Sequence, residues 1–310
     1  MLLPPLQSMS NVAIRGICTA SGLTAKTLAA KLTAAYCTSD SQAILDDTAI
    51  NTVLIGTRHD SHAALTVQAL RAGKHVFVEK PLCLTEEELQ DIRSTCEKQA
   101  AEGLHLMVGF NRRFSPHAKE ARTFFSSRSN PLVMLYRINA GRIPADHWVQ
   151  DPDVGGGRVI GEVCHFVDYM HALCASPPTS VFASRVGRHS SGITEDQCSL
   201  SLTFGDGSIG TIIYTAEGSS ALQKEHFEAH ADGMSLVMSD FMETRTYHNG
   251  KSALFKTAKR DKGFAQEMAQ FVQAIEQGLP PVIPFEQIDA VTRACLLAVR
   301  SLSSGVAYPL

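Results

Sequence analysis

The chain lacks the cysteine pattern of a disulfide-stabilised protein. Its eight cysteines are scattered, without any Cys-x-x-Cys pair, and we interpret them as the reduced thiols of a cytoplasmic protein. The sequence also lacks an unbroken apolar run of about 18 residues, the length that a membrane-spanning helix needs. Residues 1–6 show neither the basic segment nor the apolar core of a secretion signal. We therefore expect neither membrane insertion nor secretion.

An excess of charge of either sign is absent as well. The chain carries 28 Lys and Arg against 31 Asp and Glu, a net charge of -3, which offers no general attraction to nucleic acid or to an anionic membrane. Small molecules are the expected ligands. With 310 residues, 44% of them hydrophobic, the chain can build two cores, so we expect two domains.

Residues 1–113 predict an alternation of strands and helices. Turn and capping residues mark the helix ends: Ser61 is expected to cap one helix, Gly73 to end it, and Thr85 with Glu88 to form a capping box for the next. Such alternation implies right-handed crossovers and a Rossmann-like, doubly wound parallel sheet in an α/β domain. We expect strands at 12–19, 52–57, 75–78 and 104–110, and helices at 25–32, 61–72 and 85–102.

Residues 114–310 predict a different architecture. β-rich runs are separated by turn residues such as Asp206-Gly207 and Asp232-Gly233, which favour hairpins. Two helices, at 264–277 and 285–301, close the chain. We expect an α+β domain with a large, open, mostly antiparallel sheet, its strands at 133–140, 180–186, 197–204, 208–216, 226–231 and 235–238.

A dinucleotide-binding domain normally opens with a strand, a Gly-x-Gly-x-x-Gly loop and a helix whose N-terminus faces the pyrophosphate. No such segment precedes Val12. The literal match, Gly205, Gly207 and Gly210, is followed by the β-branched run 211–215, which predicts a hairpin and leaves no helix to meet a phosphate. We therefore expect the Rossmann-like sheet to be incomplete at its N-terminus, without its first strand and glycine loop.

The end of the strand at 12–19 lacks the acidic residue that binds the ribose 2′-hydroxyl of NAD. Thr19 and Ser21 stand there, with Lys26 nearby. Hydroxyl groups at this place accommodate a 2′-phosphate and favour NADP, although an ordinary strand–helix turn explains the same residues equally well.

Polar side chains follow two of the predicted parallel strands, at the edge where open α/β sheets bind ligands. Glu79-Lys80-Pro81 follows the strand at 75–78, and a lysine desolvated there can exchange a proton with a substrate hydroxyl; a surface ion pair is the alternative. The other segment follows the strand at 52–57, and its alternative is a solvated loop that Ser61 caps. We expect it to meet phosphate or ribose through Thr57, Arg58, His59 and His62.

A glycine turn at 155–157 leads into a predicted helix that carries Glu162, His165 and Asp168. Their spacing of three residues lets His165 meet either carboxylate, and a histidine oriented by an acid can orient a substrate hydroxyl or share its proton. The alternative is a satisfied core histidine. We expect no metal site, since His226 and His230 lack further ligands in a strand.

Four segments, at 53–62, 69–82, 108–116 and 155–168, resemble the glucose-fructose oxidoreductase/inositol dehydrogenase (Gfo/Idh/MocA) family. The resemblance implies hydride transfer between the nicotinamide of NAD or NADP and a sugar, nucleotide sugar or cyclitol, with association into homodimers or homotetramers through the C-terminal sheet. It implies that Lys80 contacts the nicotinamide ribose and the reacting hydroxyl, that His165 lies by the substrate, and that Glu79 borders the cofactor. From the matching segments we also place Asn111 and Trp148 at the cofactor.

One feature of the sequence departs from the family pattern, and another is similar to a subgroup of the family. The aspartate that usually stands four residues before the helix histidine is Gly161 here, and Glu162 is the candidate to replace it as a catalytic residue. The stretch 148–158 is similar to a subgroup fused behind a zinc alcohol-dehydrogenase-like domain, so an upstream domain is expected. Gly161 and the absent glycine loop favour an alternative: a non-catalytic cofactor- or sugar-sensing member, or a truncated one, that uses its sheet for association.

Overall fold

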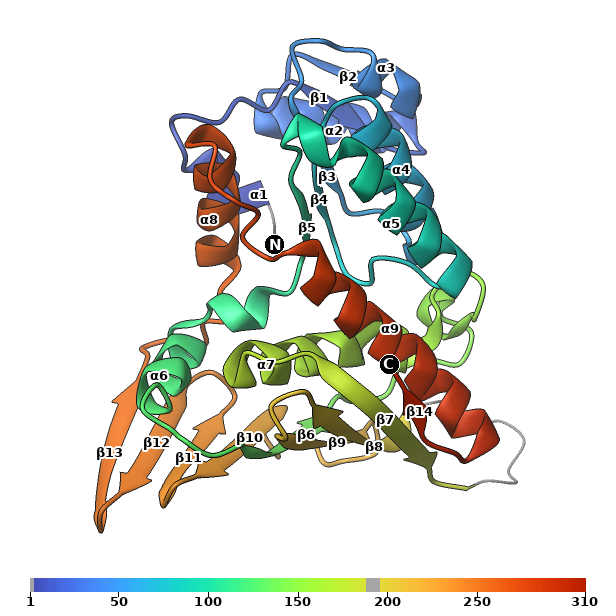
Figure 1. Ribbon diagram of the computed structural model, residues 1–310. Helices are drawn as coiled ribbons and strands as arrows, with labels where there is room; N and C mark the ends of the chain where they lie inside the picture. Colours follow the sequence, from blue (N-terminus) through green and yellow to red (C-terminus); the bar gives the residue numbers. More distant parts are fainter. Residues whose placement is uncertain (1–2, 188–195) are drawn as a thin grey trace.

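Short parallel strands and helices lie above a large, twisted sheet in the computed structural model, which describes residues 3–187 and 196–310 (Figure 1). The parallel strands come from the first third of the chain and the large sheet from the remainder. This arrangement confirms the expected fold class, a Rossmann-like α/β unit joined to an α+β unit with an open, mostly antiparallel sheet.

The parallel strands form two sheets rather than one. β1 (Gly16–Cys18) pairs with β2 (Tyr36–Thr38), and β3 (Thr52–Ile55), β4 (His75–Val78) and β5 (Leu106–Val108) form a separate sheet. In a complete doubly wound sheet, the first strand in sequence lies between these two groups. The break between β1 and β3 therefore falls at the place of the first strand of a complete doubly wound sheet.

Helices surround these strands, and local signals set most of their ends. The bounds are α1 (Leu3–Gln7), α2 (Gly22–Leu32), α3 (Ser41–Leu45), α4 (His62–Arg71) and α5 (Glu86–Gln99), with 3-10 turns η1 (His59–Ser61), η2 (Ala100–Glu102) and η3 (Asn111–Phe114). The sequence did not predict β2 and α3, because three and five residues are too few to show a period.

Two of the three helix-end predictions are confirmed. The Glu88 amide donates to the Thr85 hydroxyl at 3.1 Å and the Thr85 amide to the Glu88 carboxylate at 3.3 Å, which is the expected capping box. Gly73, at φ 71°, follows the end of α4 in the left-handed region. The prediction that Ser61 caps α4 is wrong. The Ser61 hydroxyl donates to the Arg58 carbonyl oxygen at 2.8 Å and accepts from no helix amide, because a 3-10 turn precedes α4.

The large sheet has nine strands in the order β13-β12-β11-β10-β6-β9-β8-β7-β14, antiparallel except for the β6–β9 pair. Asp232 and Gly233, at φ 52° and 71°, form the expected hairpin, and the Gly205–Gly210 match lies at the β8–β9 turn, as predicted. The bounds are β6 (Val133–Asn139), β7 (Pro178–Arg185), β8 (Gln197–Phe204), β9 (Ile209–Thr215), β10 (Glu225–Ala231), β11 (Met234–Ser239), β12 (Glu243–His248), β13 (Lys251–Lys256) and β14 (Tyr308–Pro309).

Strands β12, β13 and β14 were not predicted from the sequence. β13 is exposed along nearly its whole length, so it lacks the alternation that marks a half-buried strand. The Asn249-Gly250 turn between β12 and β13, at φ 51° and 70°, was the signal that could have found both strands.

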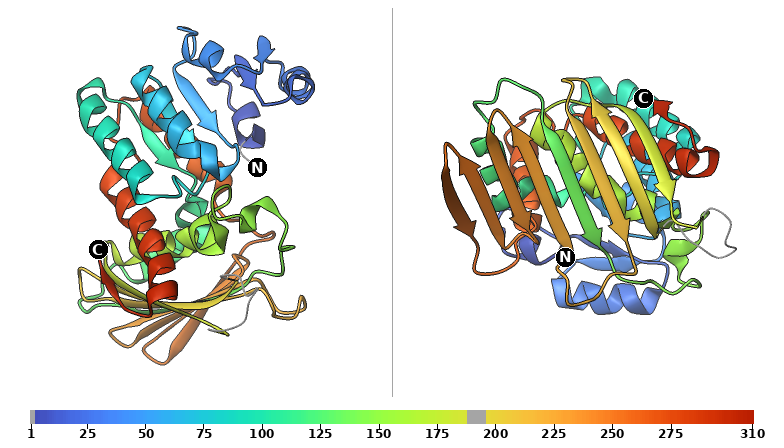
Figure 2. Two further views of the ribbon diagram at one scale, coloured as in Figure 1. Left: turned by 90° about the vertical axis from the view of Figure 1, so that its right-hand side faces the viewer. Right: turned by 90° about the horizontal axis from the view of Figure 1, so that it is seen from below.

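Helices cover one face of the large sheet only. They are α6 (Pro116–Phe124), the π-helical turn η5 (Val159–Val163) with α7 (Cys164–Cys174), and α9 (Phe285–Ser304), while α8 (Phe264–Glu276) lies beside the parallel strands (Figure 1). α9 joins the two halves, since it contacts α5 and β5 as well as β7. Seen from below, the other face of the sheet lies in front of all the helices (Figure 2).

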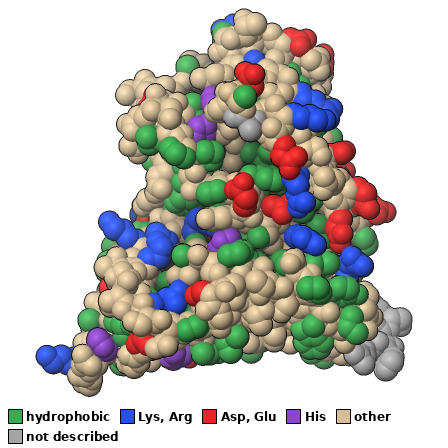
Figure 3. Space-filling view, in the orientation of Figure 1, with side chains coloured by type: hydrophobic (Ala, Val, Ile, Leu, Met, Phe, Trp, Pro, Cys, Tyr) green, Lys and Arg blue, Asp and Glu red, His purple; other side chains and the backbone are tan. Residues whose placement is uncertain are grey.

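Within the described residues, no helix combines the length and the apolar composition needed to cross a membrane. Acidic and basic side chains are intermixed on the face shown in Figure 3.

Candidate active site

Lys80 stands where the two halves of the chain meet. It follows β4, and the Glu79 amide before it donates to the Ile55 carbonyl oxygen at 2.8 Å, which extends the parallel pairing. The half-buried Lys80 ammonium then reaches across to the C-terminal half and donates to the Gly161 carbonyl oxygen at 2.7 Å. The strand end predicted to carry chemistry thus faces the predicted glycine turn and helix.

The loop after β3 is braced against the Lys80-Pro81 turn by His62. The His62 ring is fully buried, with Nδ1 2.7 Å from the Pro81 carbonyl oxygen and Nε2 3.2 Å from the Thr57 carbonyl oxygen. This burial weighs against a direct contact between His62 and a cofactor. Thr57 and Arg58 are exposed at the same sheet edge, where a ligand can reach them.

His59 lies beside this brace, against the glycine turn. Its Nδ1 is 2.7 Å from the Gly155 carbonyl oxygen, and its ring meets that of Trp148 edge-on, with centroids 4.8 Å apart. Burial lowers the pKa of His59 to about 4, with a further contribution from the charge of Lys80, although the bond to Gly155 opposes the shift. His59 is therefore neutral at physiological pH.

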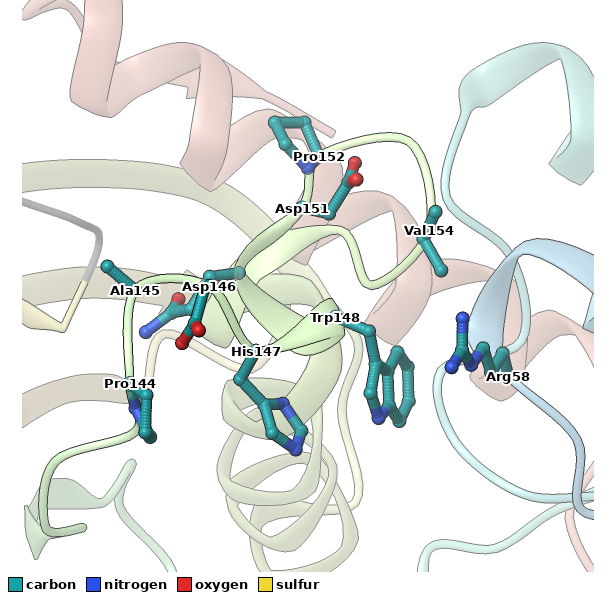
Figure 4. Close-up of a pocket in the computed structure, with 10 residues that line it drawn as sticks. Arg58, Pro144, Ala145, Asp146, His147, Trp148, Asp151, Pro152 and Val154 are labelled. Carbon is teal, nitrogen blue, oxygen red and sulfur yellow. The ribbon is translucent and has the colours of Figure 1, made fainter.

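A cavity of about 850 Å³ opens between the halves at Trp148, which belongs to the 3-10 turn η4 (Trp148–Gln150). The Arg58 guanidinium lies 5.6 Å from the centre of the indole, and Figure 4 shows the two groups facing each other from opposite sides. An aromatic face beside a cation suits the apolar face and the hydroxyl edge of a sugar ring. Asp146, His147 and Asp151 line the same cavity.

His165 is 6% exposed, and its Nδ1 has no hydrogen-bond partner among the described residues. Burial lowers its pKa well below the usual range, and the charges of Arg112 and Lys80 lower it further. The expectation that a neighbouring acid orients this histidine is wrong. Glu162 and Asp168 bind other partners. The π-helical turn before α7 breaks the α-helical spacing between Glu162 and His165, and Arg113 binds Asp168 within α7.

The Glu162 carboxylate is held by three groups. It accepts from Arg158 and Lys224, both at 2.7 Å, and from the Tyr214 hydroxyl at 2.5 Å. Burial alone would raise the pKa of Glu162, but Lys224, Tyr214 and Arg158 outweigh it and hold the pKa far below the usual range. A carboxylate so firmly ionised is a poor proton donor, so the contacts favour a positioning role, and the catalytic role of Glu162 stays a prediction.

Glu225 is another buried carboxylate, and the sequence did not predict it as a site residue. It accepts two hydrogen bonds from Arg112, at 2.8 and 2.9 Å, one from Lys262 at 2.5 Å and one from Tyr136 at 2.8 Å. Burial would raise its pKa, yet Arg112 and Lys262 lower it to about 2. Only Arg112, in the segment 108–116, gave a signal, and its partner lies too far along the chain to be inferred from spacing.

The remaining predicted residues bind backbone carbonyl oxygens of the chain itself. Asn111 is fully buried, and its Nδ2 donates to the Lys262 carbonyl oxygen at 2.8 Å, which weighs against a cofactor contact. The Thr19 hydroxyl donates to the Ser21 carbonyl oxygen at 2.6 Å, beside β1 in the smaller parallel sheet. Arg113 was not predicted, although it binds the Asp168 carboxylate through its Nε at 2.9 Å and anchors α7.

The side chains at this sheet edge suit the nicotinamide end of a dinucleotide better than its pyrophosphate. Lys80, Glu79 and the exposed Thr57 and Arg58 share the carboxyl edge of the β3–β5 sheet. His165 has an unpartnered Nδ1 among the described residues, and the charge of Lys80 contributes to its lowered pKa. The described residues include no glycine loop between β1 and β3 to hold a pyrophosphate.

Comparison with known proteins identifies the family and the fold of the chain. Residues 1–110 match the model of an oxidoreductase family with an NAD-binding Rossmann fold, and residues 132–235 match the GFO/IDH/MocA C-terminal domain. Among solved structures, levoglucosan dehydrogenase in complex with NADH and levoglucosan has the same fold, with a TM-score of 0.82 and 20% identity over 96% of this chain and 90% of that one.

Relatives by sequence include D-xylose 1-dehydrogenase (NADP(+)) 2 of Haloferax volcanii, 24% identical over 87% of this chain and 83% of the relative. Inositol 2-dehydrogenase of Rhizobium meliloti is 27% identical over 74% of this chain and 71% of the relative. The match to the uncharacterized oxidoreductase YrbE of Bacillus subtilis, at 29% identity, spans 57% of this chain and about half of that relative, 52%. With both halves matched by its models, the chain belongs to the GFO/IDH/MocA oxidoreductase family.

Proposed function

We propose that the protein is an NAD(P)-dependent oxidoreductase that transfers a hydride between nicotinamide and a hydroxyl or carbonyl carbon of a sugar, nucleotide sugar or cyclitol. The observation that carries the proposal is Lys80, which follows β4 and is held 2.7 Å from the Gly161 carbonyl oxygen beside the unpartnered His165. The named activities of relatives, on xylose and inositol, support the substrate class.

The side chains divide the chemistry between them. A bound nicotinamide would supply the acceptor for the hydride, that is, for the hydrogen that the substrate carbon loses together with both electrons of its C–H bond. The hydroxyl proton passes to Lys80 once its ammonium group has released a proton to solvent, while His165 orients the same hydroxyl by a hydrogen bond. Glu162 fixes Lys224 and Tyr214 around the substrate, and the indole of Trp148 packs against the substrate ring.

We assign cofactor binding to residues 1–113 and substrate binding and association to residues 114–310. Thr57, Arg58, His59, Glu79 and Lys80 border the cofactor in this proposal. Its preference is for NADP, because the exposed Ser21, Thr19 and Lys26 bring no carboxylate to the 2′ position. We also propose a homodimer or homotetramer through the open sheet face and, from the eight free cysteines, a cytoplasmic location; an upstream domain stays a prediction.

The break between β1 and β3 favours the second candidate, a member that keeps the fold without turnover. Titration of the chain with NADH and NADPH, followed by nicotinamide fluorescence, separates the two. Micromolar binding, followed by reduction of NAD or NADP in a screen of aldoses, uronates, nucleotide sugars and inositols, supports the enzyme. Absence of binding up to millimolar cofactor contradicts it and supports the non-catalytic role.

A further inference from the structure

Position 161 has no side chain, and His59 fills the space that a side chain there would take. A Cβ atom built on Gly161 would lie 3.1 Å from Cε1 and 3.5 Å from Nδ1 of His59. The carbonyl oxygen of Gly161 meanwhile accepts the hydrogen bond from Lys80. His59 and Lys80, from two different strand ends, thus meet on the same residue of the C-terminal half.

The contacts of His59 fix its tautomer. The Gly155 carbonyl oxygen can only accept, so Nδ1 of the neutral ring must carry the hydrogen, and Nε2 carries the free lone pair. No described residue donates a hydrogen bond to Nε2, and Nε2 is not among the fully buried polar atoms that lack a partner. A hydrogen-bond acceptor is therefore left open to a ligand.

The ring is also held in orientation. Trp148 packs edge-on against it and lines the cavity between the halves. With the Gly155 bond on one side and the indole on the other, His59 has little freedom to turn, which is the condition for a precise hydrogen bond to a substrate.

We propose that His59 replaces the side chain that Gly161 lacks, with its Nε2 accepting a hydrogen bond from a substrate hydroxyl next to the one whose proton passes to Lys80. This inference rests on the proposed function. Lys80 then exchanges the proton of the reacting hydroxyl, and His59 positions the substrate through the neighbouring hydroxyl. The two groups act from neighbouring strand ends, β3 and β4, with Gly161 between them.

A four-member cycle tests the exchange of side chains: wild type, His59→Ala, Gly161→Asp, and the double variant. We expect each single variant to lose about tenfold or more in kcat/KM for the sugar, the cost of about one hydrogen bond to the substrate. His59→Ala removes the acceptor, and Gly161→Asp forces its carboxylate against the His59 ring. In the double variant the new carboxylate occupies the space that the imidazole vacates, and we expect kcat/KM to recover to within about threefold of wild type.

Circular dichroism and a thermal melt show that the variants remain folded. Both should match those of wild type, because Lys80 and the sheet edge are unchanged. His59→Phe, which keeps the ring volume without a nitrogen, should lose kcat/KM like His59→Ala. A double variant no better than its singles, or a His59→Ala enzyme with wild-type kcat/KM, overturns the inference while the proposed function stands.

The state of His59 can be measured without turnover, because Trp148 is the only tryptophan in the chain. Protonated imidazole quenches a neighbouring indole. His147, whose ring centroid lies 5.7 Å from that of Trp148, is first removed by His147→Gln. Fluorescence should then fall on acidification with a midpoint near pH 4, and the transition should be missing in the variant that also carries His59→Phe.

A midpoint near 6.5, the ordinary value for histidine, would show that His59 is not held as a neutral acceptor and would overturn the inference. A wild type that shows the transition at about pH 4 but neither binds NADH nor turns over a sugar contradicts the proposed function and the role of His59 in it. The two proposals therefore fail by different results.

Discussion

The Lys80 ammonium and the Gly161 carbonyl oxygen, 2.7 Å apart, join the N-terminal half of the chain to the C-terminal half. The contact requires the carboxyl end of β4 and the glycine turn before α7 to lie face to face. His59 lies against Gly161 at this junction, and its ring contacts that of Trp148. Three of the four segments that resemble the family, at 53–62, 69–82 and 155–168, thus meet at one place.

Lys80→Ala should lower kcat by about 10²- to 10⁴-fold, the usual contribution of a proton-transferring side chain. The substitution removes the group that exchanges the hydroxyl proton, while its single bond to Gly161 adds little to stability. Steady-state kinetics and a thermal melt measure the two effects. Lys98→Ala, an exposed lysine of α5, is the matched control. Turnover equal to that of wild type in Lys80→Ala would refute the assigned role.

Glu225→Gln should destabilise the fold by about 3–5 kcal/mol, because it leaves Arg112 and Lys262 buried without a counter-charge. Their ion pairs with Glu225 have almost no exposed surface at Glu225 and Arg112. Urea unfolding gives the free energy. The control, Glu217→Gln, breaks the exposed pair with Arg142 and should leave the unfolding curve unchanged. Equal effects from the two substitutions would show that the buried cluster is not needed for stability.

Local signals in the sequence predicted most elements, since Thr85, Gly73 and the Asp232-Gly233 turn act within a few residues. The site was predictable only as separate pieces at strand and helix ends. Its internal contacts were not, because Glu225 reaches Arg112 from another strand and His59 fills the space at Gly161 from another half. The π-helical turn also rotates Glu162 away from His165, and no spacing argument based on an α-helix could foresee that.

Acid should destabilise the protein between about pH 6.5 and pH 4 through its buried histidines. Burial lowers the pKa of His171 to about 4, with help from the charge of Arg113, and His59 behaves alike. The unfolded chain, with histidine near 6.5, binds more protons than the folded chain in this window. The free energy of unfolding therefore falls as the pH falls, by about 1.4 kcal/mol per pH unit for each such histidine.

His171→Asn should reduce the pH dependence of the free energy of unfolding by the contribution of one buried histidine. The measurement is the free energy of unfolding in urea at pH 7, 6 and 5. The exposed His248→Asn variant controls for the substitution itself. A slope in His171→Asn identical to that of wild type would mean that His171 is charged in the folded protein, against the burial that the structure gives it.

The open face of the large sheet should hold two or more copies of the chain together. Val133 and Ile209 are direct cross-strand neighbours on this face and are 52% and 49% exposed, and Ile213 and Phe182 add to the same surface at 42% and 39%. Helices cover the opposite face only, so these side chains have no partner within the described chain. Exposed apolar groups in this number on one flat face mark a surface for association.

Ile209→Asp places a carboxylate in this surface, where burial in an interface would cost several kcal/mol without a partner charge. Ile209 is a better choice than Ile213, because Ile213 adjoins Tyr214, which faces the helices and binds Glu162. Light scattering after size-exclusion chromatography should give a dimer or tetramer for wild type and a monomer for Ile209→Asp. The control is Leu279→Asp. Leu279 has a similar exposure, 44%, but lies between α8 and α9, so this variant should keep the wild-type mass. A monomeric wild type would leave the apolar face without this role.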